Sequence, residues 1–221
     1  MSGGVGPRRR LVLVLARHDA AGASPPGVDP AAFARACLAD VYEVAADLVD
    51  ARSGLVGPAV LDELLWPGAV RFDDQGLEDL LSRCAEVADE VVLVPADVPD
   101  LPGLVLAKQL KVLHRADVAV APERGGPGCV ALGFRLPVAG WVPVADLDLD
   151  LDPRSTLRAA APSAGSVEST PDWHRLRGSA AVHRLDPALE GWEETRALLS
   201  GLSGLSGLAG RSGRSGRSGR A

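Results

Sequence analysis

The sequence predicts a single α/β domain of three layers, in which helices cover both faces of a mostly parallel sheet. Short apolar runs alternate along the chain with segments of helical periodicity, as in successive strand–helix units. The runs at 11–16 and 91–94 are continuous rather than alternating, which is typical of strands buried on both faces. The chain has 221 residues, 47% of them hydrophobic, which is enough for one well-packed domain.

The first half of the chain predicts strands separated by two helices. The run at 11–16 is too short for a helix and predicts a buried strand. Asp29 is placed as an N-cap with Pro30 at the first helical position, and apolar residues at helical spacing continue that helix to about Asp50. Further elements are expected as a strand and a short helix within 54–68, a short strand at 69–72 and an amphipathic helix at 77–87.

The second half completes the sheet and then loses its pattern. The recognisable elements are a strand at 91–94, a helix at 104–114, and strands at 118–121 and 130–135. Asp alternates with Leu over 146–152, which predicts an exposed strand or an extended acidic edge. Residues 159–172 are predicted as a loop, and 192–199 as a last helix packed with Trp173 and Trp192.

Two cationic segments flank the predicted domain. We divide the chain into a basic N-terminal extension (1–10), an α/β domain (11–200) and a tail (201–221). The tail repeats with period three as GLSGLSGLAGRSGRSGRSGRA and lacks proline, so a disordered tail is expected rather than a collagen-like helix. A weak electrostatic arm for an acidic partner is the alternative for this segment.

The charge distribution argues against nucleic acid as a partner. The net charge is −6, and seven of the 23 basic residues lie in the two flanking segments, so 16 basic residues face 29 acidic ones in the body. A nucleic-acid surface needs clustered cations to neutralise phosphates.

The remaining composition favours a cytoplasmic protein. The three cysteines are widely spaced and include no CxxC pair, so neither a disulfide framework nor a zinc site is expected. The apolar run after Arg8-Arg9-Arg10 is shorter than the core of a secretory signal. No run reaches the roughly 20 apolar residues of a transmembrane helix, so no membrane association is expected.

Two segments after predicted strands carry the candidate chemistry. Asp97-Val-Pro-Asp100 follows the strand at 91–94, and the Gly-Gly-Pro-Gly loop at 125–128 follows the strand at 118–121. The carboxyl ends of strands form the ligand-binding crevice of open α/β sheets. Carboxylates there suit a divalent metal, and glycines permit close backbone approach to a base, sugar or phosphate.

The block at 97–102, DVPDLP, resembles the D-x-P-D-L-P motif of small bacterial GT-A-like proteins with a nucleotide-diphospho-sugar transferase fold. These are distant relatives of the 2-phospho-L-lactate guanylyltransferases. Ala107 and Leu110 in the next helix and the segment 122–126, PERGG, are similar to further family elements, as is the helix start at 75–83. The likeness extends thinly from Leu11 to about Leu199.

The resemblance implies a metal-dependent transferase that uses a nucleotide or nucleotide-sugar donor for glycosyl or nucleotidyl transfer to an unknown acceptor. Asp97 would hold Mg²⁺ or Mn²⁺, and Asp186 is similar in position to a late family carboxylate that would complete the metal site. The donor-binding residues would be Arg17, Gly22, Asp100, Arg124, Gly125 and Gly126.

Two departures from the family keep a second hypothesis open. The loop after the first strand is cationic in the family, but here Arg17 is the only arginine or lysine within 17–27. Arg124 stands where the family has an aspartate. A triphosphate needs several charge-assisted contacts, so the alternative is a catalytically degenerate GT-A-like module that binds a ligand or a protein.

Each candidate residue also has a structural interpretation. Asp97 would cap the turn stiffened by Pro99, and Asp100 would N-cap the following helix, which is its leading role. The glycines would form a turn between two strands. The histidines, including His18, are expected to be structural, since no metal-ligand cluster or catalytic motif surrounds them.

Overall fold

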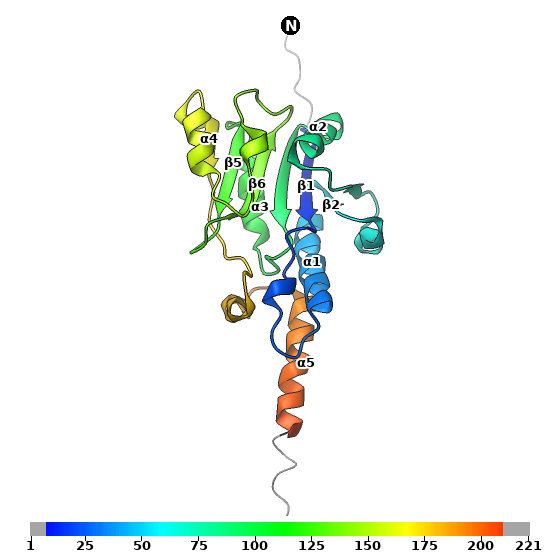
Figure 1. Ribbon diagram of the computed structural model, residues 1–221. Helices are drawn as coiled ribbons and strands as arrows, with labels where there is room; N and C mark the ends of the chain where they lie inside the picture. Colours follow the sequence, from blue (N-terminus) through cyan, green and yellow to red (C-terminus); the bar gives the residue numbers. More distant parts are fainter. Residues whose placement is uncertain (1–7, 210–221) are drawn as a thin grey trace, which may run out of the picture.

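The computed structural model describes residues 8–209, with the backbone alone for 202–209, and contains one seven-stranded sheet with helices on both faces (Figure 1). The strand order is β3-β2-β1-β4-β6-β5-β7. The strands are β1 Arg10–Leu15, β2 Arg52–Val56, β3 Val70–Phe72, β4 Glu90–Pro95, β5 Val118–Pro122, β6 Cys129–Arg135 and β7 Val167–Ser169. The α-helices are α1 Pro30–Ala46, α2 Leu77–Val87, α3 Gly103–Val112, α4 Arg154–Ala160 and α5 Glu193–Ala209.

The sheet is mostly parallel, as the sequence predicts, with one reversal. β1 pairs in parallel with β2 and β4, and β2 pairs in parallel with β3. β6 runs antiparallel to both β4 and β5, while β7 is parallel to β5. The chain leaves β1 toward β2 and β3 and then returns to β4 on the other side, so the boundary between β1 and β4 is the point where the strand order reverses.

Two apolar clusters hold the layers together. On one face, Leu11 and Leu13 of β1 belong to a buried cluster with Leu80 of α2 and Leu157 of α4. On the other face, the alternate residues Val12 and Val14 belong to a cluster with α1 and α3. Because side chains along a strand point to opposite faces, one continuous apolar run supplies both cores.

One of the two predicted helix N-caps is confirmed and the other is wrong. The Asp29 carboxylate accepts a hydrogen bond from the Ala32 backbone N–H at 2.8 Å, which confirms the predicted N-cap. Asp100 does not cap α3: the N-cap is Pro102, which has no capping side chain. The short helix predicted within 54–68 is a 3₁₀ helix at Ala59–Leu64.

Three predicted boundaries differ from the structure. Asp146 ends a 3₁₀ turn, Val144–Asp146, and the rest of the segment 146–152 is loop without the predicted strand; Asp150 and Asp152 bind arginines there. The predicted loop at 159–172 contains the short edge strand β7. Helix α5 continues to Ala209, past the predicted domain end at residue 200, and the rest of the predicted tail (210–221) lies outside the described residues.

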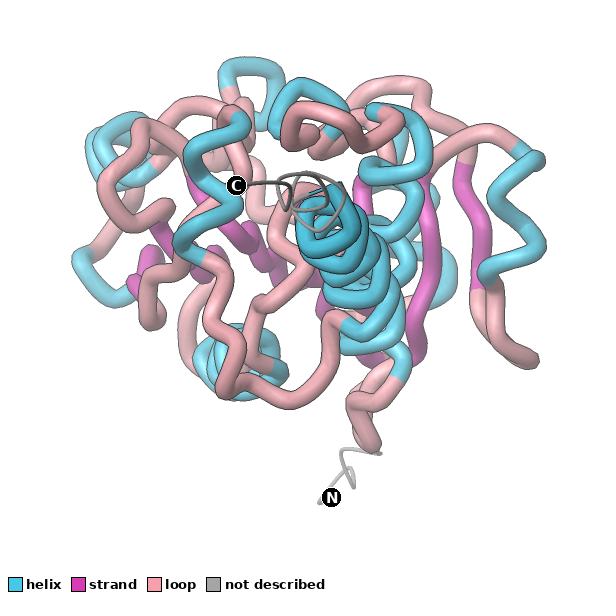
Figure 2. The backbone as a smooth tube through the Cα atoms, turned by 90° about the horizontal axis from the view of Figure 1, so that it is seen from below, coloured by secondary structure: helices cyan, strands magenta, loops and turns pink. Residues whose placement is uncertain are grey.

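The C-terminal helix is tied to the domain by a buried carboxylate. Asp40 of α1 accepts hydrogen bonds from the backbone N–H groups of Glu194 and Thr195 at 3.0 and 2.8 Å, so it caps α5 from another helix. Seen from below, α5 projects end-on from the body beside the loops at the carboxyl ends of the strands (Figure 2). No helix within 8–209 is both long and apolar enough to cross a membrane.

The basic N-terminal segment joins the domain where it is described. Arg10 is the first residue of β1, Arg8 and Arg10 pair with the buried Glu90, and Arg9 pairs with Asp89. These arginines therefore neutralise carboxylates at the start of β4, while residues 1–7 lie outside the described part of the chain.

Candidate functional site

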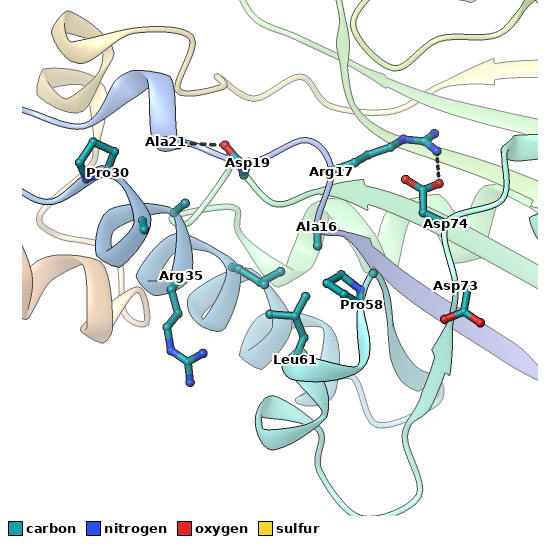
Figure 3. Close-up of a pocket in the computed structure, with 14 residues that line it drawn as sticks. Ala16, Arg17, Asp19, Ala21, Pro30, Arg35, Pro58, Leu61, Asp73 and Asp74 are labelled. Carbon is teal, nitrogen blue, oxygen red and sulfur yellow. Dashed lines mark hydrogen bonds and ion pairs between the residues drawn. The ribbon is translucent and has the colours of Figure 1, made fainter.

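A pocket of about 820 Å³ lies at the carboxyl ends of β1, β2 and β3 (Figure 3). We call it the donor pocket, after the nucleotide or nucleotide-sugar donor that the family resemblance implies. It is lined by Ala16, Arg17, Asp19, Ala21, Pro30, Ala31, Ala34, Arg35, Leu38, Gly57, Pro58, Leu61, Asp73 and Asp74. The apolar members come mainly from α1 and the segment after β2, and the charged members, apart from Arg35 of α1, from the loops that follow β1 and β3. The pocket therefore has a largely apolar wall and a charged rim.

The arginines at the rim already have carboxylate partners. Arg17 donates to Asp74 at 2.6 Å, the pair joined by a dashed line in Figure 3, and Arg35 lies 2.6 Å from Glu63. Both pairs are partly exposed, so they are weak and can exchange partners. A negatively charged ligand would therefore compete with Asp74 for Nη1 of Arg17.

A second pocket of about 740 Å³ lies on the other side of Arg17. It is lined by Arg17, His18, the α2 start at 75–79, and loop residues 144–148 and Asp150. Arg17 thus separates an apolar pocket from a pocket rich in carboxylates, which positions it to contact a ligand that extends from one into the other.

Asp97 lies just past β4, as predicted, but its side chain faces inward. The side chain of Arg175 donates from Nε to both carboxylate oxygens of Asp97, at 2.8 and 3.0 Å. Asp97 is 3% exposed and Arg175 only 1%. Burial is the largest influence on the Asp97 carboxyl and raises its pKa to about 6, although the adjacent Arg175 lowers that pKa.

The Asp97–Arg175 pair belongs to a larger group of charges, which we call the arginine network. Asp150 bridges the two arginines: its Oδ1 forms an ion pair with Arg175 Nη1 at 2.9 Å and accepts a hydrogen bond from Arg177 Nη1 at 2.6 Å. Arg177 also pairs with the buried Glu123 at 3.0 Å. The network links the end of β4, the loop at 147–150, the end of β5 and the segment 173–177.

The glycine loop packs against this network. A Cβ atom at Gly126 would lie 2.2 Å from the Glu123 carboxyl carbon, and one at Gly128 would lie 2.6 Å from both Arg177 Nη2 and the Leu149 carbonyl oxygen. Gly125 has φ = 73°, a conformation that favours glycine. Close packing therefore explains why glycine is required at Gly126 and Gly128, which supports the interpretation of this loop as a structural turn.

Asp100 and Asp186 meet, but through the backbone of Asp186. Asp100 accepts hydrogen bonds from Trp173 Nε1 and from the Asp186 backbone N–H, each at 3.1 Å, and His174 Nε2 lies 3.1 Å from it. The Asp186 carboxylate accepts from the Ala188 backbone N–H at 2.9 Å, so it caps its own turn. Asp100 therefore fastens the 173–186 segment to the sheet.

These residues do not fit a divalent metal as they are arranged. Both Asp97 oxygens are engaged by a guanidinium, and Asp186 is turned to its own backbone. Within residues 8–209, no group of three or more His, Cys, Asp or Glu side chains is placed to hold a metal ion.

The remaining residues predicted to bind the donor ligand do not lie together. Arg124 pairs with Asp172 at 2.9 Å and lies over the Trp173 ring, away from the lining of the donor pocket. Gly22 lies in a 3₁₀ turn, Ala21–Ala23, whose first residue lines that pocket. Arg17 is the predicted donor residue that the structure places in its wall.

Sequence reasoning missed Arg175, Arg177 and Asp150. The only local signal is the HRLR stretch at 174–177, in which two arginines alternate with a buried leucine in a segment otherwise predicted as irregular. Their partners lie from 25 to 78 positions away in sequence, so no local pattern links them.

Comparisons with known proteins identify the fold. The chain is similar to a candidate nucleotide-diphospho-sugar transferase from Desulfovibrio desulfuricans G20, with a TM-score of 0.65 and 20% identity over 89% of this chain and 96% of that one. It is also similar to 4-diphosphocytidyl-2C-methyl-D-erythritol synthase from Anaerococcus prevotii DSM 20548, with a TM-score of 0.51 and 9% identity over 74% and 86% of the two chains. Rv0371c from Mycobacterium tuberculosis H37Rv, solved in complex with manganese, matches with a TM-score of 0.47 and 19% identity over 88% of this chain and all of that one.

The chain has the fold of nucleotide-diphospho-sugar transferases, which confirms the predicted fold class. No protein-family model matches the sequence, and no curated protein matches it. At this level of identity the likeness establishes the fold, and function rests on the site itself.

Replacing Gly128 by Ala should destabilise the protein by about 1–3 kcal/mol, because a Cβ atom would collide with the Leu149 backbone and with Arg177. Thermal unfolding in the absence of ligand measures the loss. Gly140→Ala is the control, since nothing lies within 4 Å of its added Cβ, and its effect should stay within about 0.5 kcal/mol. Equal stability of both variants would show that the loop does not pack as described.

The pKa of His18 should lie below its ordinary value, because burial of the imidazole lowers it more than Asp150 raises it. The unfolded chain then binds a proton more readily than the folded one. The free energy of unfolding should therefore fall as the pH is lowered through about 6.5, and less so for His18→Gln.

NMR titration of the His18 ring protons, against the same signals in the denatured chain, gives the pKa directly. A folded-state pKa equal to or above the denatured value would contradict this arrangement.

Proposed function

We propose that the chain binds a nucleotide or nucleotide-sugar in the donor pocket, as the donor for glycosyl or nucleotidyl transfer. The observation that carries this proposal is the pocket itself: about 820 Å³, within the usual range of small-molecule sites, at the carboxyl ends of three parallel strands. It adjoins the point of strand reversal between β1 and β4, where ligands bind in open α/β sheets.

The chemistry of the lining supports a base and a sugar more strongly than a phosphate chain. Pro58 and Leu61 offer apolar contact to a planar base, and Asp19 and Asp73 offer acceptors to amino and hydroxyl groups. Arg17 would release Asp74 and take a phosphate oxygen through charge-assisted hydrogen bonds.

The metal-dependent form of this transfer finds no support at Asp97 and Asp186. Arg175 holds the first carboxylate and the second caps its own turn. The transferase proposal therefore rests on the donor pocket and Arg17, without a step through a metal at these residues.

A second candidate function is a catalytically degenerate module that binds a ligand or a protein. The pairing of Arg17 with Asp74 and of Arg35 with Glu63 favours it, because neither cation is free to neutralise a leaving phosphate. Both candidate functions place the ligand in the donor pocket, but only the transferase converts that ligand to product.

Filling the pocket should abolish nucleotide binding. Ala34→Trp introduces an indole into the lining of the donor pocket, whereas Ala32→Trp adds the same group to an exposed position of α1 outside that lining. We expect calorimetric titration with a panel of nucleoside triphosphates and nucleotide-sugars to show binding by the wild type and by Ala32→Trp. Ala34→Trp should lose at least tenfold in affinity, about 1.4 kcal/mol.

The outcomes separate the candidates. Binding that is equal in the two tryptophan variants would contradict the donor pocket. Binding accompanied by donor hydrolysis or transfer supports the transferase, and binding without turnover for any donor and acceptor supports the degenerate module.

A further inference from the structure

The Arg175 guanidinium is surrounded by carboxylate and backbone carbonyl oxygens. Its Nε contacts both oxygens of Asp97, and its Nη1 contacts Asp150 Oδ1 and the Leu149 carbonyl oxygen at 2.9 Å and the Cys129 carbonyl oxygen at 3.2 Å. We call these five oxygens, from four residues, the oxygen cage. They come from the end of β4, the start of β6 and the loop at 149–150.

Carboxylate and backbone carbonyl oxygens in this combination are the ligands that hard divalent cations prefer. Buried arginines more often meet carboxylates in a planar, forked geometry. Here Nη1 donates hydrogen bonds to the two carbonyls and forms an ion pair with Asp150, so three oxygens lie within 3.2 Å of one nitrogen, much as ligands surround a compact cation.

The charges around the oxygen cage are consistent with a divalent cation in place of the singly charged Arg175. Asp97, Asp150 and Glu123 carry three negative charges, and Arg175 and Arg177 carry two positive ones. With Arg175 removed, the network would hold a net charge of about −2, a deficit that one divalent cation offsets. A buried deficit of that size is costly unless it is compensated.

We propose that Arg175 is the resident cation of the oxygen cage: its guanidinium takes the place of a divalent metal, and removal of its side chain converts the cage into a divalent-cation site. The proposal concerns the cage alone and holds whatever ligand the donor pocket binds. It also accounts for the poor fit of Asp97 to a metal in the protein as it stands.

The test is Mn²⁺ binding, followed by the loss of the free Mn²⁺ signal in electron paramagnetic resonance. We expect the wild type to bind no Mn²⁺ at the cage. Arg175→Ala should bind one Mn²⁺ per chain, at least about tenfold more tightly than any weak Mn²⁺ binding by the wild type elsewhere on its surface, and its melting temperature should rise with Mn²⁺ or Ca²⁺. Adding Asp97→Asn to Arg175→Ala should remove the gained binding.

Arg124→Ala is the matched control, because it removes an arginine that is paired with a carboxylate outside the cage. It should gain no Mn²⁺ site. Arg175→Met, which keeps much of the side-chain volume, serves beside Arg175→Ala in case the smaller residue prevents folding. Folding of either variant only in the presence of Mn²⁺ would support the proposal.

Two results would overturn it. One is the absence of gained Mn²⁺ binding in both Arg175 variants. The other is measured on the wild type alone: one Mn²⁺ bound per chain and lost in Asp97→Asn would show that a metal, and not Arg175, is the cation at Asp97.

Discussion

The ion pair between Asp97 and Arg175 is the constraint around which the carboxyl-end face of the sheet is organised. Both side chains are removed from water, so each is tolerable only while the other stays in contact. Nε of Arg175 donates to both oxygens of Asp97, and its Nη1 donates to the carbonyls of Leu149 and Cys129. The end of β4, the start of β6 and the loop at 149–150 must therefore be in place together.

This requirement explains features that otherwise look like parts of a ligand site. Gly126 and Gly128 lack a Cβ where Glu123, Arg177 and the Leu149 carbonyl approach most closely. The aspartate-rich segment at 146–152 supplies Asp150, which lies between the two arginines. The motif after β4 and the glycine loop thus stabilise the fold through the arginine network. The donor pocket lies elsewhere, at the carboxyl ends of β1 to β3.

The proposed function therefore rests on one place, the donor pocket. The donor pocket combines apolar contact with carboxylate acceptors and two exchangeable arginines, Arg17 and Arg35. The phosphates of a donor gain little from such a lining, whereas its base and sugar gain contacts on several sides. Any catalytic step at this pocket lacks clustered cations to stabilise the negative charge of the transition state. Positioning of the reactants therefore has to contribute more of the rate enhancement.

The sequence predicts the layers well because they depend on local signals. The continuous apolar run of β1 and the Asp29–Pro30 helix start both act within a few residues, and the structure has both. The antiparallel direction of β6 and the role of Asp100 depend on partners far along the chain. Arg175 was beyond prediction for the same reason, since its alternation with Leu176 says nothing of Asp97, which lies 78 positions before it.

A double-mutant cycle on Asp97→Ala and Arg175→Met tests the central claim most directly. Each single variant leaves a buried charge without its partner and should lower the free energy of unfolding by about 3–5 kcal/mol. The double variant should lose less than the sum of the two, with a coupling energy of about 2–3 kcal/mol measured by urea denaturation. Additivity within about 0.5 kcal/mol would show that the two residues do not depend on each other, and would contradict this account.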